Sequence, residues 1–384
     1  MVLHDRISDL PDDLLLHILS FLPTNLAFTT TLISKRWSSL FYSLDVLHFD
    51  YKTFKDDDIN WHGFRRFVDN LMLSPLSPNK PLKRFYLDCY FEDQQKDSHI
   101  IINSWLEAAN RRGIKEFRLN LHFNTLKNNI LISRTLVILN LKLINIARDI
   151  SCVSLPSLKT LILYYVLFKS PNDYMDFLSA CPILQDLHAK RIFYTNLGEY
   201  NAPEERFKSL TLSKLVRASI GSIDAILNVF KNVEYLSLKI TLNPIDQETS
   251  FKVIPVFQNL IHTKLVFCQG FFHIWDTVVE LLQHSPKLQI LFIRKWTRSS
   301  SSKEWKCPSS VLECVSSHLR SCTILSFDGL GLASDLQFAR YILQNASLLE
   351  KMKISNEMLL EESQIIKELS SCPRKSPTCK LFIQ

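Results

Sequence analysis

Near its start the chain reads Asp9-Leu-Pro-Asp-Asp-Leu-Leu-Leu-His-Ile-Leu-Ser-Phe-Leu-Pro23 and then Thr31-Leu-Ile-Ser-Lys-Arg-Trp37. In the first stretch apolar residues recur at helical spacing, at Leu14, Ile18 and Leu22. An aspartate ahead of the first proline predicts the start of a helix, and the second proline predicts its end. We therefore expect a short helix with a wide apolar face at the front of the chain.

A second helix is expected shortly afterwards, because Leu32, Ile33, Trp37, Leu40 and Phe41 also follow helical spacing. Helices this apolar cannot bury all of their surface within a segment of about 45 residues. Two interpretations follow: the remaining apolar surface binds another protein, or it packs on the rest of the same chain.

The body of the chain repeats the pattern Leu-x-x-Leu-x-Leu, with conservative replacements, from Leu82 to the C-terminus. Clear examples begin at Leu136, Leu158 and Leu288, and successive examples start 22 to 32 residues apart. The alternation predicts a short strand in each repeat. Helical patterns precede several of these strands, over residues 173–180, 276–283 and 336–344. Strand and helix at this spacing are typical of stacked leucine-rich repeats, whose single units cannot bury their apolar faces alone.

The repeats depart from the usual pattern in one respect. An asparagine or cysteine is expected after the third apolar position, and only Asn145 fills that place. We therefore expect an irregular repeat with imperfect strand pairing. An unrelated α/β fold built from similar strands is the alternative. Residues 51–81 are expected to form a helical linker, because apolar residues follow helical spacing between Trp61 and Leu71.

The N-terminal residues Asp5-Arg-Ile-Ser-Asp-Leu-Pro-Asp-Asp-Leu-Leu-Leu-His-Ile-Leu-Ser-Phe-Leu-Pro-Thr24 and Ser34-Lys-Arg-Trp37 resemble the F-box of plant F-box proteins. The resemblance implies binding to a Skp-type adaptor and, through it, to a cullin–RING ubiquitin ligase. The residues that it places in or under the adaptor contact are Leu10, Pro11, Leu14, Ile18, Leu19, Leu22 and Trp37. The family often has Trp where this chain has Phe41, which implies weaker packing but not lost binding.

The C-terminal part resembles a second family segment, the FBD domain of plant F-box/leucine-rich-repeat proteins. The matching blocks include Trp305-Lys-Cys-Pro308, His318-Leu-Arg320, Phe327-Asp-Gly329 and Cys372-Pro-Arg374. A helix over 359–369 and a strand over 379–383 are expected to cap the last repeat. The predicted fold class is therefore α/β, with an all-helical F-box, an irregular leucine-rich-repeat solenoid and a C-terminal FBD cap. The predicted divisions are 1–50, 51–81, 82–304 and 305–384.

Composition excludes several classes of function. The chain has 384 residues and a formal net charge of +7, and seven glycines leave little material for glycine-rich phosphate-binding loops. No apolar run is long enough to span a membrane, and the acidic start does not resemble a signal peptide. We expect a cytoplasmic or nuclear protein with reduced cysteines. Cys314, His318 and Cys322 have metal-like spacing but lack a fourth ligand. No metal, cofactor or catalytic residue is predicted.

The residues between the repeat leucines should point away from the core, because side chains alternate along a strand. Basic residues outnumber acidic ones at these positions, interleaved with aromatic residues and histidine. The candidates for a target-binding face are Arg118, Lys142, Tyr164, His188, Lys190, Tyr235, Lys239, Lys264 and Arg294. Such a face would attract an acidic or phosphorylated protein segment, or a polyanion. The alternative is a solvated face with no ligand.

These features favour a non-catalytic substrate receptor of a Skp–cullin–F-box ubiquitin ligase. The N-terminal helices would bind the adaptor, and the repeats would capture a target protein. Two other functions remain open: a non-degradative binding scaffold, and a polyanion or nucleic-acid binder that uses the basic face.

Overall fold

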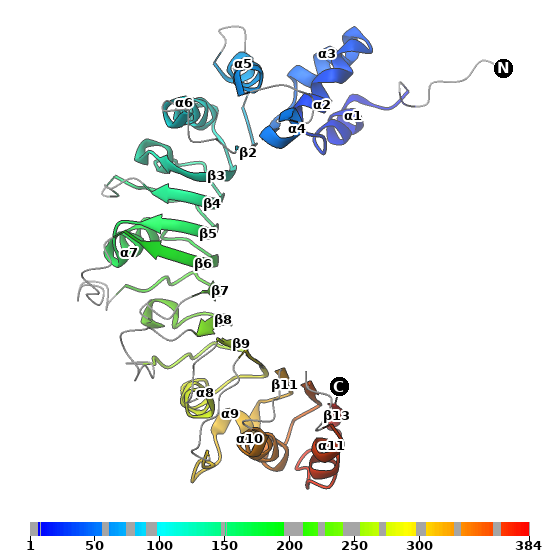
Figure 1. Ribbon diagram of the computed structural model, residues 1–384, viewed down its shortest axis with the longest axis vertical. Helices are drawn as coiled ribbons and strands as arrows, with labels where there is room; N and C mark the ends of the chain where they lie inside the picture. Colours follow the sequence, from blue (N-terminus) through cyan, green and yellow to red (C-terminus); the bar gives the residue numbers. More distant parts are fainter. Residues whose placement is uncertain are drawn as a thin grey trace, which may run out of the picture. The chain divides into compact units, whose positions relative to one another are not determined.

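The computed structural model describes residues 7, 9–55, 61–73, 81–89, 98–146, 150, 152–195, 210–221, 227–240, 254–268, 274–296, 305–325, 332–355 and 362–383. The chain divides into two compact units. The first comprises Met1–Leu184 and Arg191–Tyr200, and the second comprises Gln185–Lys190 and Asn201–Gln384. In each unit parallel strands follow one another in the sheet in the same order as in the sequence (Figure 1). The protein is therefore of the mixed α/β class, as predicted.

The first unit begins with α1 (Asp12–Leu19), α2 (Thr24–Thr29), the 3-10 helix η1 (Thr30–Leu32) and α3 (Lys35–Tyr42). Pro11 is the N-cap of α1, and no side chain caps this helix, which begins at Asp12 shortly after the predicted start signal. Ser34 caps α3, because its hydroxyl accepts a hydrogen bond from the Trp37 N–H at 3.5 Å. Leu32 and Ile33 therefore precede α3 and do not belong to it, contrary to the sequence prediction.

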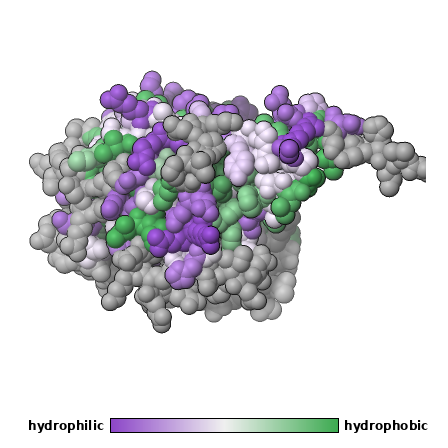
Figure 2. Space-filling model, turned by 90° about the horizontal axis from the view of Figure 1, so that it is seen from above, coloured by the Kyte–Doolittle hydropathy of each residue, from purple (hydrophilic) through white to green (hydrophobic). Residues whose placement is uncertain are grey.

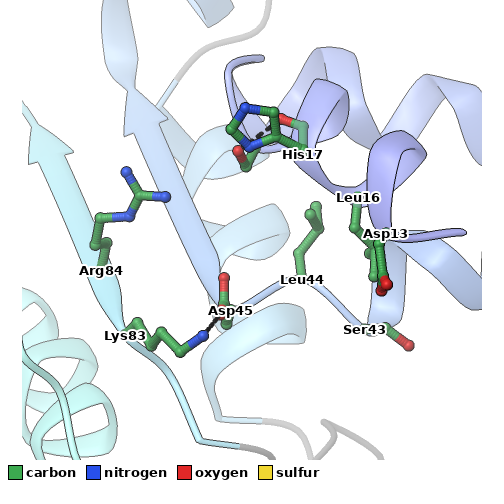
Figure 3. A pocket seen from close by; sticks show the side chains of 9 residues that line it. Asp13, Leu16, His17, Ser43, Leu44, Asp45, Lys83 and Arg84 are labelled. Carbon is green, nitrogen blue, oxygen red and sulfur yellow. Dashed lines mark hydrogen bonds and ion pairs between the residues drawn. The ribbon is translucent and has the colours of Figure 1, made fainter.

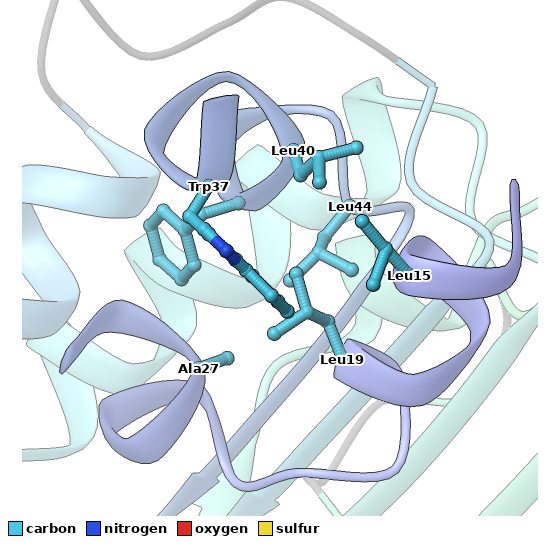
Figure 4. Close-up of a cluster of buried hydrophobic side chains, with 7 residues drawn as sticks. Leu15, Leu19, Ala27, Trp37, Leu40 and Leu44 are labelled. Carbon is cyan, nitrogen blue, oxygen red and sulfur yellow. The ribbon is translucent and has the colours of Figure 1, made fainter. Parts of the chain in front are cut away.

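These helices close a small hydrophobic core of their own. Its buried members are Leu15, Leu19, Ala27, Trp37, Leu40, Phe41 and Leu44 (Figure 4). The indole of Trp37 extends toward Leu19 at the centre of the cluster. Burial of each large apolar side chain contributes about 1.5–3 kcal/mol to folding. The core fixes the positions of α1 and α3, and it thereby determines which side chains of these helices remain outside.

A strand follows the helices almost directly. β1 (Val46–Asp50) pairs in parallel with β2 (Arg84–Asp88). The prediction of an all-helical segment up to residue 50 is therefore wrong for its last five residues. Val46, Leu47 and Phe49 suit a strand, and their burial beside β2 outweighs the helical pattern upstream.

Two helices connect β1 to β2 within the described residues, α4 (Tyr51–Lys55) and α5 (Trp61–Met72). The second of them confirms the helix predicted between Trp61 and Leu71, and it buries Trp61, Phe64, Val68 and Met72. The other elements of the first unit are α6 (Ser98–Arg111), β3 (Glu116–Leu126), η2 (Asn128–Leu131), β4 (Ile138–Ile146), β5 (Thr160–Phe168) and α7 (Pro171–Ser179). In Figure 1, α6 and α7 lie on the same side of strands β3 to β5.

The repeat leucines explain the pairing of these strands. Leu139 pairs with Leu161 and Leu141 with Leu163, and all four side chains are buried. The two inward leucines of one strand therefore lie beside the two equivalent leucines of the next strand. This stacking fixes the register, because a slip of one residue would expose every leucine.

The strands of the first unit share an irregularity just after the second of these leucines. Leu143 and Tyr165 have φ angles of 52° and 57°, in the left-handed region, and the register shifts between Asn120 and Asn124 in β3. This confirms the expected imperfect pairing. Asn145 Nδ2 donates a hydrogen bond to the carbonyl of Phe123 at 2.7 Å. The asparagine therefore satisfies a backbone group of the neighbouring repeat where the strand bends.

The second unit has the same alternation of elements. Its strands are the first part of β6 (Asp186–Tyr194), β7 (Arg217–Ile220), β8 (Tyr235–Ile240), β9 (His262–Phe267), β10 (Ile290–Lys295), β11 (Ser321–Leu325), β12 (Lys351–Ser355) and β13 (Lys380–Ile383). Its helices within the described residues are η4 (Leu227–Phe230), α8 (Ile274–Gln283), α9 (Glu313–Ser317), α10 (Leu332–Asn345) and α11 (Glu362–Ser370).

The helical patterns read from the sequence correspond to α7, α8 and α10, and α11 and β13 lie where a terminal helix and strand were predicted. The serine-rich segment expected as a loop, residues 298–303, lies outside the described residues. Among the helices described, none combines the length and the apolar character needed to cross a bilayer.

Candidate functional site

Apolar side chains remain on the surface of α1 after the N-terminal core has closed. Leu14 is 50% exposed and Ile18 is 46% exposed, and Phe21, just beyond the helix, is 72% exposed. Spacings of four and three residues place such side chains along one face of a helix. Pro11 is exposed at the start of the same face. Figure 2, which looks onto this end of the molecule, shows hydrophobic residues reaching the surface beside hydrophilic ones.

A second group of exposed apolar residues lies where η1 leads into α3. Leu32 is 86% exposed and Ile33 is 65% exposed, and Leu26 on α2 is also exposed. Single exposed leucines are ordinary on protein surfaces, whereas several large apolar side chains on one small helical unit mark a contact surface. We call Pro11, Leu14, Ile18, Phe21, Leu26, Leu32 and Ile33 the N-terminal apolar surface.

The structure separates the predicted adaptor residues into three groups. Pro11, Leu14 and Ile18 are exposed, and Leu10 and Leu22 are partly buried. Leu19 and Trp37 are buried in the core, so they can support a contact only from beneath. The sequence prediction missed Phe21, Leu26, Leu32 and Ile33 as surface residues. The sequence shows that these four residues are apolar, but it does not show that α3 begins only after Ser34.

Arg36 joins the starts of α1 and α3. Its guanidinium donates hydrogen bonds to the carboxylate of Asp12 at 2.6 and 2.9 Å and to the carbonyl of Leu10 at 2.6 Å. The side chains of Arg36 and Asp12 are 39% and 63% exposed, so the ion pair contributes only about 0.2–1 kcal/mol to stability. Its effect is to hold the backbone before Pro11 against α3, which fixes the end of the apolar face.

A polar pocket of about 380 Å³ lies beside α1, near the starts of β1 and β2 (Figure 3). Its lining includes Asp13, His17, Ser20, Asp45, Lys83 and Arg84. Lys83 Nζ and an Asp45 carboxylate oxygen form an ion pair at 2.6 Å. The walls therefore carry charges of both signs, which select neither an anion nor a cation. The sequence analysis did not single out this pocket.

The outward residues of strands β1 to β5 compensate one another in charge. Arg118, a predicted target-binding residue, forms an ion pair with Glu116 at 2.6 Å, and its guanidinium carbon lies 4.9 Å from the ring centroid of Tyr86. On the next row, Asn120 donates a hydrogen bond to Asp88 at 2.9 Å. Lys142 and Tyr164 are adjacent across β4 and β5. In the first unit the predicted face is therefore mixed, and not basic.

The outward residues of strands β8 to β13 are different, because the charged residues among them are all lysine or arginine. Register places Tyr235, His262, Ile290, Ser321, Lys351 and Lys380 in one row, and Ser237, Lys264, Phe292, Thr323, Lys353 and Phe382 in the next. A third row contains Lys239, Val266, Arg294, Leu325 and Ser355. Within the described part of the chain, the basic residues of these rows form no ion pair. We call these three rows the basic strand face.

At the start of the second unit the predicted residues His188 and Lys190 lie on β6, and Asp186 of the same strand forms an ion pair with Arg217. Burial, and then Lys190, lower the pKa of His188, with Asp186 opposing them. Burial and Lys264 lower the pKa of His262. Both imidazoles are therefore mostly neutral at pH 7. The positive charge of this face comes from its lysines and arginines.

Lys239, Lys264 and Arg294 are also brought together in a pocket of about 320 Å³, with Val266, Cys268 and Trp296. The sequence analysis named the three cations but missed Trp296. Its position directly after the last strand residue of its repeat could have indicated it. The backbone pairing continues to this residue, since the Trp296 N–H donates to the Phe267 carbonyl at 2.8 Å.

The cysteines near the C-terminus do not form a reactive centre. Cys314 and Cys322 are buried, and burial raises the pKa of each thiol to about 12. At neutral pH both are therefore protonated, and a protonated thiol is a poor nucleophile and metal ligand. The described residues contain no cluster of three or more His, Cys, Asp or Glu side chains that could hold a metal ion.

Comparison with known proteins agrees with this architecture. Three family models match the chain, in the order F-box domain over residues 7–49, Leucine Rich Repeat over 157–182 and FBD over 306–354. The Arabidopsis thaliana FBD-associated F-box protein At5g38590 is 31% identical over 415 residues, which cover 95% of this chain and 98% of that protein. The Arabidopsis thaliana F-box/FBD/LRR-repeat protein At5g56420 is 28% identical, with 98% of each chain covered. The Arabidopsis thaliana F-box/FBD/LRR-repeat protein At4g26340 is 29% identical, with 98% of this chain and 99% of that protein covered. The chain therefore belongs to the plant F-box/FBD/leucine-rich-repeat protein family.

Proposed function

We propose that this protein is the substrate-recognition subunit of a Skp–cullin–F-box ubiquitin ligase. The observation that carries the proposal is the N-terminal apolar surface, which lies in the segment matched by the F-box family and remains exposed after its own core has closed. A Skp-type adaptor would cover this surface and connect the chain to a cullin–RING ligase.

The adaptor contact proposed here uses the exposed members Pro11, Leu14 and Ile18 directly, with Leu10 and Leu22 at its margin. Leu19 and Trp37 hold α1 and α3 in place beneath it. Interfaces of this kind derive most of their affinity from a few well-packed apolar residues at the centre. The exposed α1 residues fit that role because their helix is fixed by a separate core.

The repeats would form a leucine-rich-repeat solenoid, closed by the FBD region, that captures a target protein. We retain the division into residues 1–50, 51–81, 82–304 and 305–384, with β1 contributing to the sheet. The protein itself would carry out no bond chemistry: its contribution is to hold a target close to the ubiquitin-transferring enzyme. Cytoplasm and nucleus are the compartments in which such a ligase would act.

Co-purification with a Skp-type adaptor tests the proposal. The native chain should retain the adaptor, and a Leu14→Asp/Ile18→Asp variant should lose it, because two carboxylates would be buried unpaired in the contact. Leu348→Asp is the matched control, since Leu348 is exposed to a similar degree but lies in the FBD-matched region. If the native chain fails to bind, or if the control loses binding equally, the proposal is wrong.

One observation favours a second function, binding of an extended polyanion such as a nucleic acid. The lysines and arginine on the basic strand face have no acidic partner among the described residues. A polyanion bound along several of them would show a steep salt dependence, with the logarithm of the affinity falling by about one unit per contact for each tenfold rise in salt. A shallow salt dependence would exclude this function.

A further inference from the structure

The pocket at the ends of β8, β9 and β10 differs from the rest of the basic strand face, because its cations converge. Lys239 on β8 and Arg294 on β10 both pair in register with Val266 on the strand between them. Adjacent strands lie about 4.8 Å apart, so the two Cα atoms are separated by roughly 10 Å. Both long side chains can therefore reach a group that lies over Val266, and Lys264 approaches from the preceding row of the same central strand.

Aromatic rings hold two of these cations without neutralising them. The guanidinium carbon of Arg294 lies 4.8 Å from the ring centroid of Trp296, and Lys264 Nζ lies 5.0 Å from that of Phe292. A ring face attracts a cation but offers no negative charge in exchange. Arg294 also lines the pocket, so its N–H donors are within reach of an acceptor there.

Arg294 also has a hydrogen-bond donor, Nε, without an acceptor among the described residues. This nitrogen is shielded from solvent. A buried donor without an acceptor is unfavourable, and most buried polar groups in native proteins are paired. Among the described residues, the pocket lining contains three cationic side chains and no carboxylate. An anionic ligand would supply both the missing acceptor and the missing negative charge.

The backbone around the pocket is held by the strand pairing. The Cys268 N–H donates to the Ile240 carbonyl at 2.9 Å, and the Trp296 N–H donates to the Phe267 carbonyl at 2.8 Å. These bonds continue the ladder one residue beyond β9 and β10. The walls of the pocket are therefore preorganised, which lowers the entropic cost of binding a ligand.

We propose that this pocket, formed by Lys239, Lys264, Arg294 and Trp296, is a binding site for a single phosphoryl group. A phosphate monoester carries nearly two negative charges and three acceptor oxygens, which suits three cations that approach from three strands. A carboxylate offers one charge and a planar pair of oxygens, so it would satisfy the cluster less completely. If the phosphoryl group is carried by a protein, this site would be part of the surface that captures the target, and the inference then rests on the proposed function.

Calorimetric titration of the full chain, purified with its adaptor, tests the proposal. The probes are inorganic phosphate, a neutral peptide with one phosphoserine, and the same peptide without phosphate. The variants are Lys239→Gln/Arg294→Gln, which empties the pocket of two cations, and Lys353→Gln, a control on β12 of the same basic strand face. Thermal melts of each variant establish that the chain remains folded.

We expect saturable binding of a phosphate-bearing probe by the native chain and by Lys353→Gln, and a loss of about tenfold or more in the pocket variant. Phosphopeptide binding well above that of inorganic phosphate would identify a protein as the carrier, and equal binding would identify a small molecule. Absence of saturable binding to the native chain, equal binding of the unphosphorylated peptide, or an equal loss in the control would overturn the site. Adaptor retention in the same preparations reports separately on the proposed function.

Discussion

Lys295 at the end of β10 and Asp335 in α10 form an ion pair that is buried on both sides, with side chains 4% and 2% exposed. The carboxylate also accepts a hydrogen bond from Trp275 Nε1 at 3.0 Å, and the ring of Trp275 stacks on Phe338 of α10. The pair therefore joins the end of a repeat strand to a helix of the FBD-matched region through a shared polar and aromatic cluster.

Removal of one partner should destabilise the second unit strongly. Lys295→Met would leave the carboxylate of Asp335 buried without its cation, and loss of one member of a buried pair costs about 3–5 kcal/mol. Denaturant unfolding followed by tryptophan fluorescence measures the change. Lys351→Met, which removes an exposed lysine from β12, should change the unfolding free energy by less than about 0.5 kcal/mol.

The double variant Lys295→Met/Asp335→Leu distinguishes an unpaired charge from lost packing. Replacement of both partners by apolar side chains should recover much of the lost stability, because no buried charge remains. A single variant within about 1 kcal/mol of the native chain would contradict this account of the pair.

The exposed and buried residues of the N-terminal helices should respond in opposite ways to substitution. Leu32→Ser and Ile33→Ser should leave the melting temperature unchanged, since both side chains are exposed in the free chain. Each should weaken adaptor binding by about 1–2 kcal/mol, because it removes apolar area from the proposed contact. Surface plasmon resonance against the adaptor, with melting curves of the free chain, gives both quantities.

Trp37→Phe provides the comparison within the core. Trp37 is buried among Leu19, Ala27 and Leu40, so the smaller ring leaves a cavity and should lower stability by about 1–3 kcal/mol. Adaptor affinity at low temperature should change less than stability does. Equal effects of Leu32→Ser and Trp37→Phe on the melting temperature would contradict the structure, in which Leu32 is exposed and Trp37 is buried.

The sequence was sufficient to predict the repeat strands because their leucines occupy inward positions whose burial decides the register. The sequence prediction failed at Val46–Asp50, because only three residues separate this strand from α3 and the preceding pattern is helical. The start of α3 was misplaced because a single serine hydroxyl, that of Ser34, caps the helix after two exposed apolar residues.

The basic face could be predicted only in part. Alternation along each strand identified the outward residues, but it does not show which of their charges are paired. Arg118 is neutralised by Glu116, two residues earlier on its own strand, whereas Lys239 and Arg294 meet no acid among the described residues. The pair of Lys295 and Asp335 spans 40 residues and two kinds of element, so no local pattern could indicate it.

Asn145 should stabilise the bend between β3 and β4 by a modest amount. Its amide donates to the Phe123 carbonyl at 2.7 Å, and a typical hydrogen bond of this kind contributes about 1 kcal/mol. Asn145→Leu should lower the unfolding free energy by about that amount. Amide exchange of β4 should accelerate near the bend, and unchanged stability would show that solvent replaces the bond without cost.

The buried thiols should make stability depend on pH above neutrality. Burial raises the pKa of Cys181, Cys314 and Cys322 to about 12, whereas an unfolded cysteine titrates near 8.5. Between these values the folded chain binds more protons than the unfolded chain, so stability falls as pH rises. Each thiol should contribute a decline of up to about 1.4 kcal/mol per pH unit above pH 8.5.

Urea unfolding at pH 7.5, 8.5 and 9.5 measures this decline, and Cys322→Ala is the informative variant. It should be less stable than the native chain at pH 7.5, because a small buried side chain is lost, but its stability should decline less steeply with pH. Parallel slopes for native chain and Cys322→Ala would mean that this thiol ionises in the folded protein, and that its burial is less complete than the core packing implies.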